Sequence, residues 1–133
     1  MAYVNKVYKL LTQDLTVPAN TIYVDGTNFN SILALTEQAE AGALVIEATG
    51  GNSGCSKDVY FNFASSIDET NWDTVPYITL QITMSGTNKV RRTVNISCPI
   101  KYLKLLSVQN TETTAGYTAT VNAYVYVKET YRV

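Results

Sequence analysis

Between residues 75 and 127 the sequence alternates apolar and polar residues in successive short segments, and this alternation constrains the fold more than any other feature. In residues 75–84 it predicts Ile78, Leu80 and Ile82 on one face and Thr79 and Gln81 on the other. A two-residue period of this kind is typical of antiparallel strands that bury one face and leave the other to water or a partner. We therefore expect the second half of the chain to form a sheet.

Further segments extend this interpretation along the chain. Residues 89–98, 102–110 and 118–128 alternate in the same way, and turn-forming residues such as Gly86 and Pro99 separate them. Residues 8–17, 21–25, 44–49 and 59–63 also have strand character. About seven or eight short strands at regular spacing predict an all-β fold, a single antiparallel β-sandwich of the jelly-roll or immunoglobulin-like kind.

The first third of the chain is harder to assign. Residues 28–41 contain the one candidate helix, so we expect at most one short helix near residues 30–41, ended by Gly42. Residues 1–15 have two interpretations. They form either the first strand of the sandwich, which we favour, or an arm that adds a strand to a neighbouring sheet. The length of 133 residues suits one domain that spans residues 1–133.

Composition argues against several function classes. The chain has no histidine and a net charge of −1, with its charged residues scattered singly. No basic stripe is present to follow a phosphate backbone, so we expect no nucleic-acid partner; Lys89, Arg91 and Arg92 are best explained as a solvated edge. No apolar stretch is long enough to cross a membrane, and the start lacks the architecture of a signal peptide, so we expect synthesis in a cytoplasm and no membrane partner.

The cysteines and the acidic loop have two interpretations each. Cys55 and Cys98 are expected to be free thiols, although a disulfide is the alternative. Residues 68–73 bring several oxygen-bearing side chains around Trp72, which is compatible with calcium. The spacing does not match a calcium-binding loop, so we favour a solvated acidic loop and predict no metal site and no cofactor.

Catalysis finds little support in the sequence. Without histidine, a serine or cysteine nucleophile needs a lysine or carboxylate as its base, and no Ser-x-x-Lys motif occurs. We therefore expect no catalytic residues and no enzyme activity.

Aromatic side chains are the candidates for contact with a partner. Tyrosines on the polar side of their strands suit an interface, because each combines a broad apolar ring with one polar end. The alternative is cross-strand ring pairing without any partner. The interface candidates are Tyr3, Tyr8, Tyr60, Tyr77, Trp72, Tyr124 and Tyr126.

The order of features in residues 65–128 resembles that of small virion proteins of tailed bacteriophages. The resemblance rests on Trp72 with its polar lead-in, the strands at 75–84 and 92–98, the run Pro99-Ile100-Lys101-Tyr102-Leu103-Lys104, Thr114-Ala115-Gly116, and the strand at 119–128. The chain is similar in this order to head-decoration (cement) proteins and related β-sandwich neck or tail components. The resemblance implies a virion protein made in the host cytoplasm, without an active site, that binds the major capsid protein and copies of itself, with a trimer favoured.

Three functions follow from these observations. The leading hypothesis is a capsid decoration protein that stabilises the phage head by bridging subunits. A carbohydrate-binding module or tail adhesin, using Trp72 and exposed tyrosines against glycans, is the alternative from a different class. A neck or tail component is a further alternative.

Overall fold

The computed structural model describes residues 2–11, 14–24, 33–34, 39–96 and 102–131. Within these ranges the chain forms ten strands and no helix. They are β1 (Ala2–Lys9), β2 (Leu15–Val17), β3 (Thr21–Val24), β4 (Leu33–Ala34), β5 (Ala39–Gly50), β6 (Asp58–Ser66), β7 (Ile78–Thr83), β8 (Lys89–Ile96), β9 (Tyr102–Asn110) and β10 (Ala119–Tyr131).

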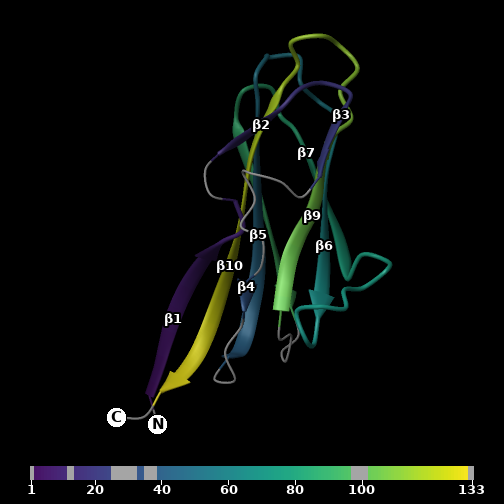
Figure 1. Cartoon of the computed structure of the whole chain (residues 1–133). Helices are drawn as coiled ribbons and strands as arrows, with labels where there is room; N and C mark the ends of the chain where they lie inside the picture. The colour runs from purple at the N-terminus through teal and green to yellow at the C-terminus, as the bar shows by residue number, and fades with distance from the viewer. Residues whose placement is uncertain (1, 12–13, 25–32, 35–38, 97–101, 132–133) are drawn as a thin grey trace.

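The strands form two antiparallel sheets that lie face to face (Figure 1). The first, called here the β10 sheet, has the order β1-β10-β5-β8, and β2 also pairs with β10. The second, the β9 sheet, has the order β3-β9-β6-β7, and β4 also pairs with β9. The all-β antiparallel sandwich expected from the sequence is thus confirmed.

The core lies between the sheets, and the alternating residues supply it as predicted. Leu80 and Ile82 of β7 are buried, while Thr79 and Gln81 are exposed. Every second residue of β10 from Ala119 to Val127 is buried. Phe61 and Phe63 of β6 are the largest fully buried side chains. Burial of one such ring contributes about 1.5–3 kcal/mol, so these positions dominate the stability of the sandwich.

The helix considered near residues 30–41 is not found among the described residues of that range. Leu33–Ala34 is β4, and residues 39–41 begin β5; the remainder of the range lies outside the described residues. The start of β5 pairs with β10, where Ala39 lies opposite Glu129. Tertiary pairing thus overrides a weak local preference for helix, because that preference is worth only tenths of a kcal/mol per residue.

The prediction of one extended segment over residues 8–17 was wrong. β1 ends at Lys9, Leu10 and Leu11 are fully buried, and a separate strand begins at Leu15. Both β1 and β2 pair with β10, one after the other along its length. Leu10 still donates its amide to the Ala123 carbonyl of β10 (2.9 Å), and the side chains of Leu10 and Leu11 fill the core beyond the end of β1.

Arg92 links the edge strands of the two sheets on one side of the sandwich. It lies opposite Ile46 on the inward face of β8, an unusual place for a charged residue. Its guanidinium Nη1 donates a hydrogen bond to the main-chain carbonyl of Gln81 on β7, 2.9 Å away. β7 and β8 are the edge strands of the two sheets, so this contact occupies an acceptor that would otherwise be open to another strand.

At the opposite end from the chain termini, two buried polar side chains tie the loops together. Asn110 donates from Nδ2 to the carbonyls of Val17 (3.1 Å) and Tyr117 (2.9 Å) and accepts from the Glu112 amide (2.9 Å). The Glu112 carboxylate in turn accepts from the amides of Ser56 (2.7 Å) and Lys57 (2.8 Å). These bonds pair polar groups that burial would otherwise leave without partners.

Cys55 is a buried free thiol beside this end of the sandwich, and its Sγ lies 3.8 Å from the Thr118 carbonyl. Cys98 lies outside the described residues. In the part of the chain that the structure describes, no helix is long and apolar enough to cross a membrane.

Candidate functional site

The seven aromatic candidates do not form one surface. Tyr124 and Tyr126 lie on the outer face of the β10 sheet, whereas Tyr60 lies on the outer face of the β9 sheet. Tyr8 packs against the core from β1. Tyr3 is a β1 residue whose side chain is outside the described part of the structure.

Trp72 and Tyr77 belong to the connection between β6 and β7. One face of the Trp72 indole is covered by Lys104, whose Nζ lies 4.5 Å from the ring centroid. This is the geometry of a cation–π contact, and it anchors the loop on β9. Trp72 is accordingly half-buried, and that face of its ring is not open to a sugar.

The acidic loop beside Trp72 uses Asp68 as a turn former. The Asp68 carboxylate accepts hydrogen bonds from the Asn71 amide (2.7 Å), the Asn71 side chain (2.7 Å) and the Thr70 amide (2.9 Å). The Asn71 main-chain bond, with these others, holds the pKa of Asp68 well below its usual range. Its oxygens thus bind donors of its own loop. Within the described ranges, no group of three or more Cys, Asp or Glu residues is arranged to hold a metal ion.

The outer face of the β10 sheet holds a polar cluster that the sequence did not predict. Glu47 of β5 is 4% exposed although it lies on the outer face, where Asn122 and Arg91 are its cross-strand neighbours. Arg91 donates to one Glu47 oxygen from both Nε (2.9 Å) and Nη2 (2.6 Å). Glu47 raises the pKa of Arg91 through this bond. Burial, followed by the charge of Glu47, raises the pKa of the neighbouring Tyr124 phenol. The bonds from Arg91 give the buried Glu47 carboxylate hydrogen-bond partners on this face.

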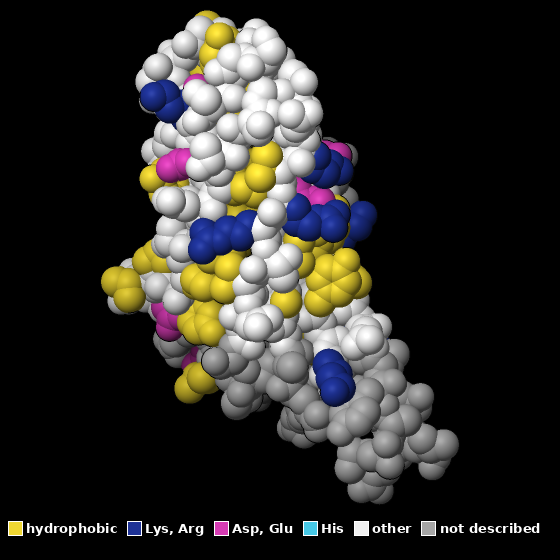
Figure 2. Space-filling model, turned by 180° about the vertical axis from the view of Figure 1, so that it is seen from behind, with side chains coloured by type: hydrophobic (Ala, Val, Ile, Leu, Met, Phe, Trp, Pro, Cys, Tyr) yellow, Lys and Arg dark blue, Asp and Glu magenta, His cyan; other side chains and the backbone are white. Residues whose placement is uncertain are grey.

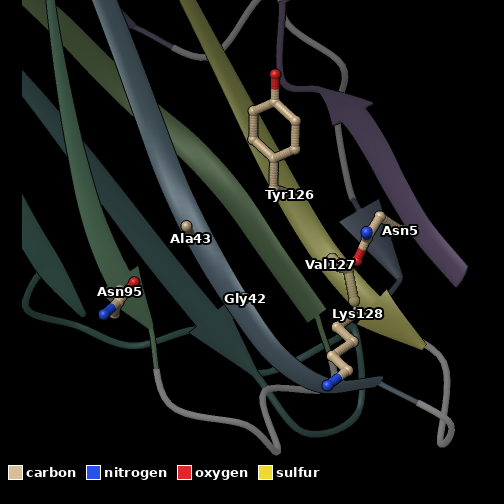
Figure 3. Close-up of a pocket in the computed structure, with 7 residues that line it drawn as sticks. All are labelled: Asn5, Gly42, Ala43, Asn95, Tyr126, Val127 and Lys128. Atoms are coloured by element: carbon tan, nitrogen blue, oxygen red, sulfur yellow. The ribbon is translucent and has the colours of Figure 1, made fainter. Parts of the chain in front are cut away.

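Below this cluster the same face is hollowed. Tyr126, Ala43 and Asn95 lie side by side in one cross-strand row, and the short Ala43 side chain leaves space between its two neighbours. The resulting shallow groove has a volume of about 230 Å³. Figure 3 shows Tyr126 above it, Lys128 below it, and Asn5 and Asn95 at its two sides. Tyr126 is 46% exposed, so its ring is available to a ligand. We name this feature the Tyr126 groove.

Positive charge gathers on the outer face of the β10 sheet although the chain as a whole carries −1. Cross-strand pairing places its charged side chains there, and among the described residues the cations outnumber the acids: Lys9, Lys89, Arg91 and Lys128 against Asp14 and Glu47. Figure 2 shows Lys and Arg side chains in a band across one side of the molecule, next to hydrophobic side chains.

Exposed apolar side chains gather at two other places, toward opposite ends of β9. One is β3, where Ile22 and Val24 are 52% and 66% exposed. The other is the loop between β6 and β7, which projects from the sandwich (Figure 1) and exposes Ile67 and Val75 by 82% and 71%. Exposed apolar side chains at such places are candidates for contact with another protein.

Of the described residues that line the Tyr126 groove, the sequence singled out Tyr126 alone as a candidate for contact. Asn5, Asn95 and Lys128 gave no local signal, because their proximity depends on the register of four strands. Only the alternation of β10, which places Tyr126 and Lys128 on one face, pointed to part of the groove.

Comparison with known proteins shows the fold and not the family. No protein-family model and no curated protein matches the sequence. The structure is similar to part of tripeptidyl peptidase 2, with a TM-score of 0.53 at 12% identity, covering 92% of this chain and 10% of that one. It is similar to the K3 adhesin domain of Lys-gingipain from Porphyromonas gingivalis w83 (TM-score 0.50, 11% identity, 85% and 71% covered). It is also similar to a chain in the structure of infectious bursal disease virus Gx strain (TM-score 0.53, 10% identity, 96% and 32% covered).

This chain therefore spans about a tenth of the peptidase chain and about a third of the viral chain. The three proteins are a peptidase, an adhesin and a virus, so the shared sandwich does not choose among functions. What the comparisons establish is that this chain is a β-sandwich domain of a kind found in proteins of these different classes.

Proposed function

We propose that this protein is a non-enzymatic structural protein of a virus particle, and specifically a decoration protein of a tailed-phage head. It binds the major capsid protein and copies of itself, as a trimer, after synthesis in the host cytoplasm. A neck or tail component is the second candidate, because it depends on the same kind of contact.

The observation that carries this proposal is the pair of exposed apolar surfaces toward opposite ends of β9. A protein that stabilises a shell by bridging subunits needs two separated contact surfaces on a rigid body. The exposed Ile22 and Val24 supply one, and the exposed Ile67 and Val75 supply the other. The sandwich between them has a closed apolar core, and no buried side-chain polar atom among the described residues lacks a hydrogen-bond partner. The likeness to a viral chain agrees with the proposal at the level of fold alone.

The direct test is the copy number in purified particles, measured by quantitative mass spectrometry against the major capsid protein. A decoration role requires a simple ratio to the capsid subunit. A small fixed number of copies per particle would move the protein to the neck or tail, and absence from particles would refute the proposal.

Contact through the projecting loop is tested by Ile67→Asn, which replaces an exposed apolar side chain without disturbing the core. We expect this variant to lose most of its binding to preformed capsids in a sedimentation assay. Thr113→Asn is the matched control, since Thr113 is exposed at the other end of the sandwich. Light scattering of the free protein tests the expected trimer. Equal capsid binding by both variants would exclude the loop as a contact.

A further inference from the structure

The Tyr126 groove brings together an exposed aromatic ring, two primary amides and a lysine. Its wall is an aromatic ring that is nearly half exposed. Such a ring offers a flat apolar face to the C–H groups of a ligand. Asn5 and Asn95 line it from two different strands, and each primary amide carries both hydrogen-bond donors and an acceptor. An aromatic face flanked by amides matches a ligand that alternates C–H faces with hydroxyl groups, which is the chemistry of a sugar.

The shape of the groove favours an extended ligand over a compact one. Asn5 is on β1 and Asn95 is on β8, so the groove crosses the full width of the sheet order β1-β10-β5-β8. Three steps between neighbouring strands correspond to about 14 Å. An open, shallow site of this length cannot enclose a small molecule as ligand cavities usually do. A short oligosaccharide that lies along the surface fits it.

The charge of the groove selects among oligosaccharides. Lys128 is the one charged residue among the described residues that line the groove. The surrounding outer face of the β10 sheet carries more cations than acids, as described above. A lysine ammonium attracts an anionic group through a charge-assisted hydrogen bond, and the local excess of positive charge reinforces this attraction.

We propose that the Tyr126 groove binds an anionic oligosaccharide. One sugar ring stacks on Tyr126, hydroxyl groups of different rings of the oligosaccharide bond to Asn5 and Asn95, and a carboxylate or sulfate of the sugar lies at Lys128. The site is separate from Trp72, one face of which Lys104 already covers. The proposal does not depend on a place in the virus particle, so either one can fail while the other stands.

The test is binding of the full chain to an array of oligosaccharides that includes carboxylated, sulfated and neutral members, followed by calorimetry on those that bind. We expect binding to anionic members. Tyr126→Ala should weaken it by about tenfold or more, in line with the energy of an aromatic stacking contact. Lys128→Gln should reduce the preference for anionic over neutral sugars. Carboxylated and sulfated members distinguish the two possible anionic groups.

Matched controls separate the groove from the rest of the surface. Tyr77→Ala removes another exposed tyrosine outside the groove, and Lys57→Gln removes an exposed lysine at the far end of the sandwich. Both should bind as the parent does. Thermal melting of Tyr126→Ala should match the parent, since the ring is on the outer face. The proposal is overturned if only neutral sugars bind, if none bind, or if binding survives Tyr126→Ala within about twofold.

Discussion

Asn110 offers the sharpest test of the structure, because its buried side chain makes three hydrogen bonds to the main chain. Its amide is fully buried, both Nδ2 protons point at main-chain carbonyls, and its oxygen accepts from a main-chain amide. Asn110→Ala leaves two carbonyls and one N–H without this partner. Each buried group left unpaired costs about 1–3 kcal/mol. Allowing for partial relaxation around the cavity, we expect a loss of about 3–5 kcal/mol in the free energy of unfolding.

A loss of this size is a large share of the total stability. A domain of this length is stabilised by about 7–20 kcal/mol. With a urea m-value of about 2 kcal/mol/M, the unfolding midpoint of Asn110→Ala should fall by about 2 M. Chemical unfolding followed by circular dichroism measures this shift directly.

Asn110→Asp separates hydrogen bonding from packing. The aspartate has nearly the same shape, but it places an acceptor oxygen where Nδ2 now donates to the carbonyls of Val17 and Tyr117. We expect it to be at least as destabilising as alanine. Gln109→Ala, one residue earlier and exposed, is the control and should stay within about 0.5 kcal/mol of the parent. A parent-like Asn110→Asp would refute the hydrogen-bonding scheme.

Three further outcomes follow from the described contacts. Ile82→Asp should unfold the domain, because it buries a charge with no counter-ion, whereas Gln81→Asp on the outer face of the same strand should not; a parent-like melt of Ile82→Asp would contradict the register of β7. Hydrogen bonds within its own turn keep the pKa of Asp68 low, so the charged form stabilises the loop at neutral pH, and that stabilisation is lost only as the pH falls below the ordinary carboxyl range of about 4. An NMR titration of its carboxyl should show a midpoint well below that of an ordinary aspartate. Gly50→Ala should lower the melting temperature markedly, since an added Cβ would collide with the Gly86 carbonyl oxygen, and a neutral effect would place the end of β5 elsewhere.

The sequence predicted the parts of the fold that depend on local alternation. Ile78, Leu80 and Ile82 of β7 were assigned to one face and Thr79 and Gln81 to the other, and the structure places them so because this strand has one apolar and one polar side. The burial of Val45 and Glu47 on the outer face of β5 was not predicted, because it depends on the position of β5 between β10 and β8.

The sequence predicted which aromatic side chains face outward, but it did not predict which residues lie beside them. Alternation along β10 singled out Tyr124 and Tyr126 as outward rings, and the structure puts them there. Nothing in the sequence indicated that Asn5 and Asn95 line the same groove, since ninety residues of chain separate them. The sheet order alone brings their two strands to this face. The same limit applies to the pair Glu47 and Arg91. Contacts of this kind arise from strand order, which local patterns do not encode.

The pairing of β1 with β10 also determines how the molecule responds to mechanical load. Ala2 lies opposite Tyr131, so the first and last strands begin and end side by side at one end of the sandwich (Figure 1). A pulling force applied across these two residues would act perpendicular to the strands and load the hydrogen bonds of their eight registered pairs one after another, as in opening a zipper. The same bonds pulled along the strand direction would share the load and break together. The sandwich is thus expected to yield at low force when pulled by Ala2 and Tyr131, and at much higher force when pulled between Ala2 on β1 and Tyr124 at the other end of its pairing with β10.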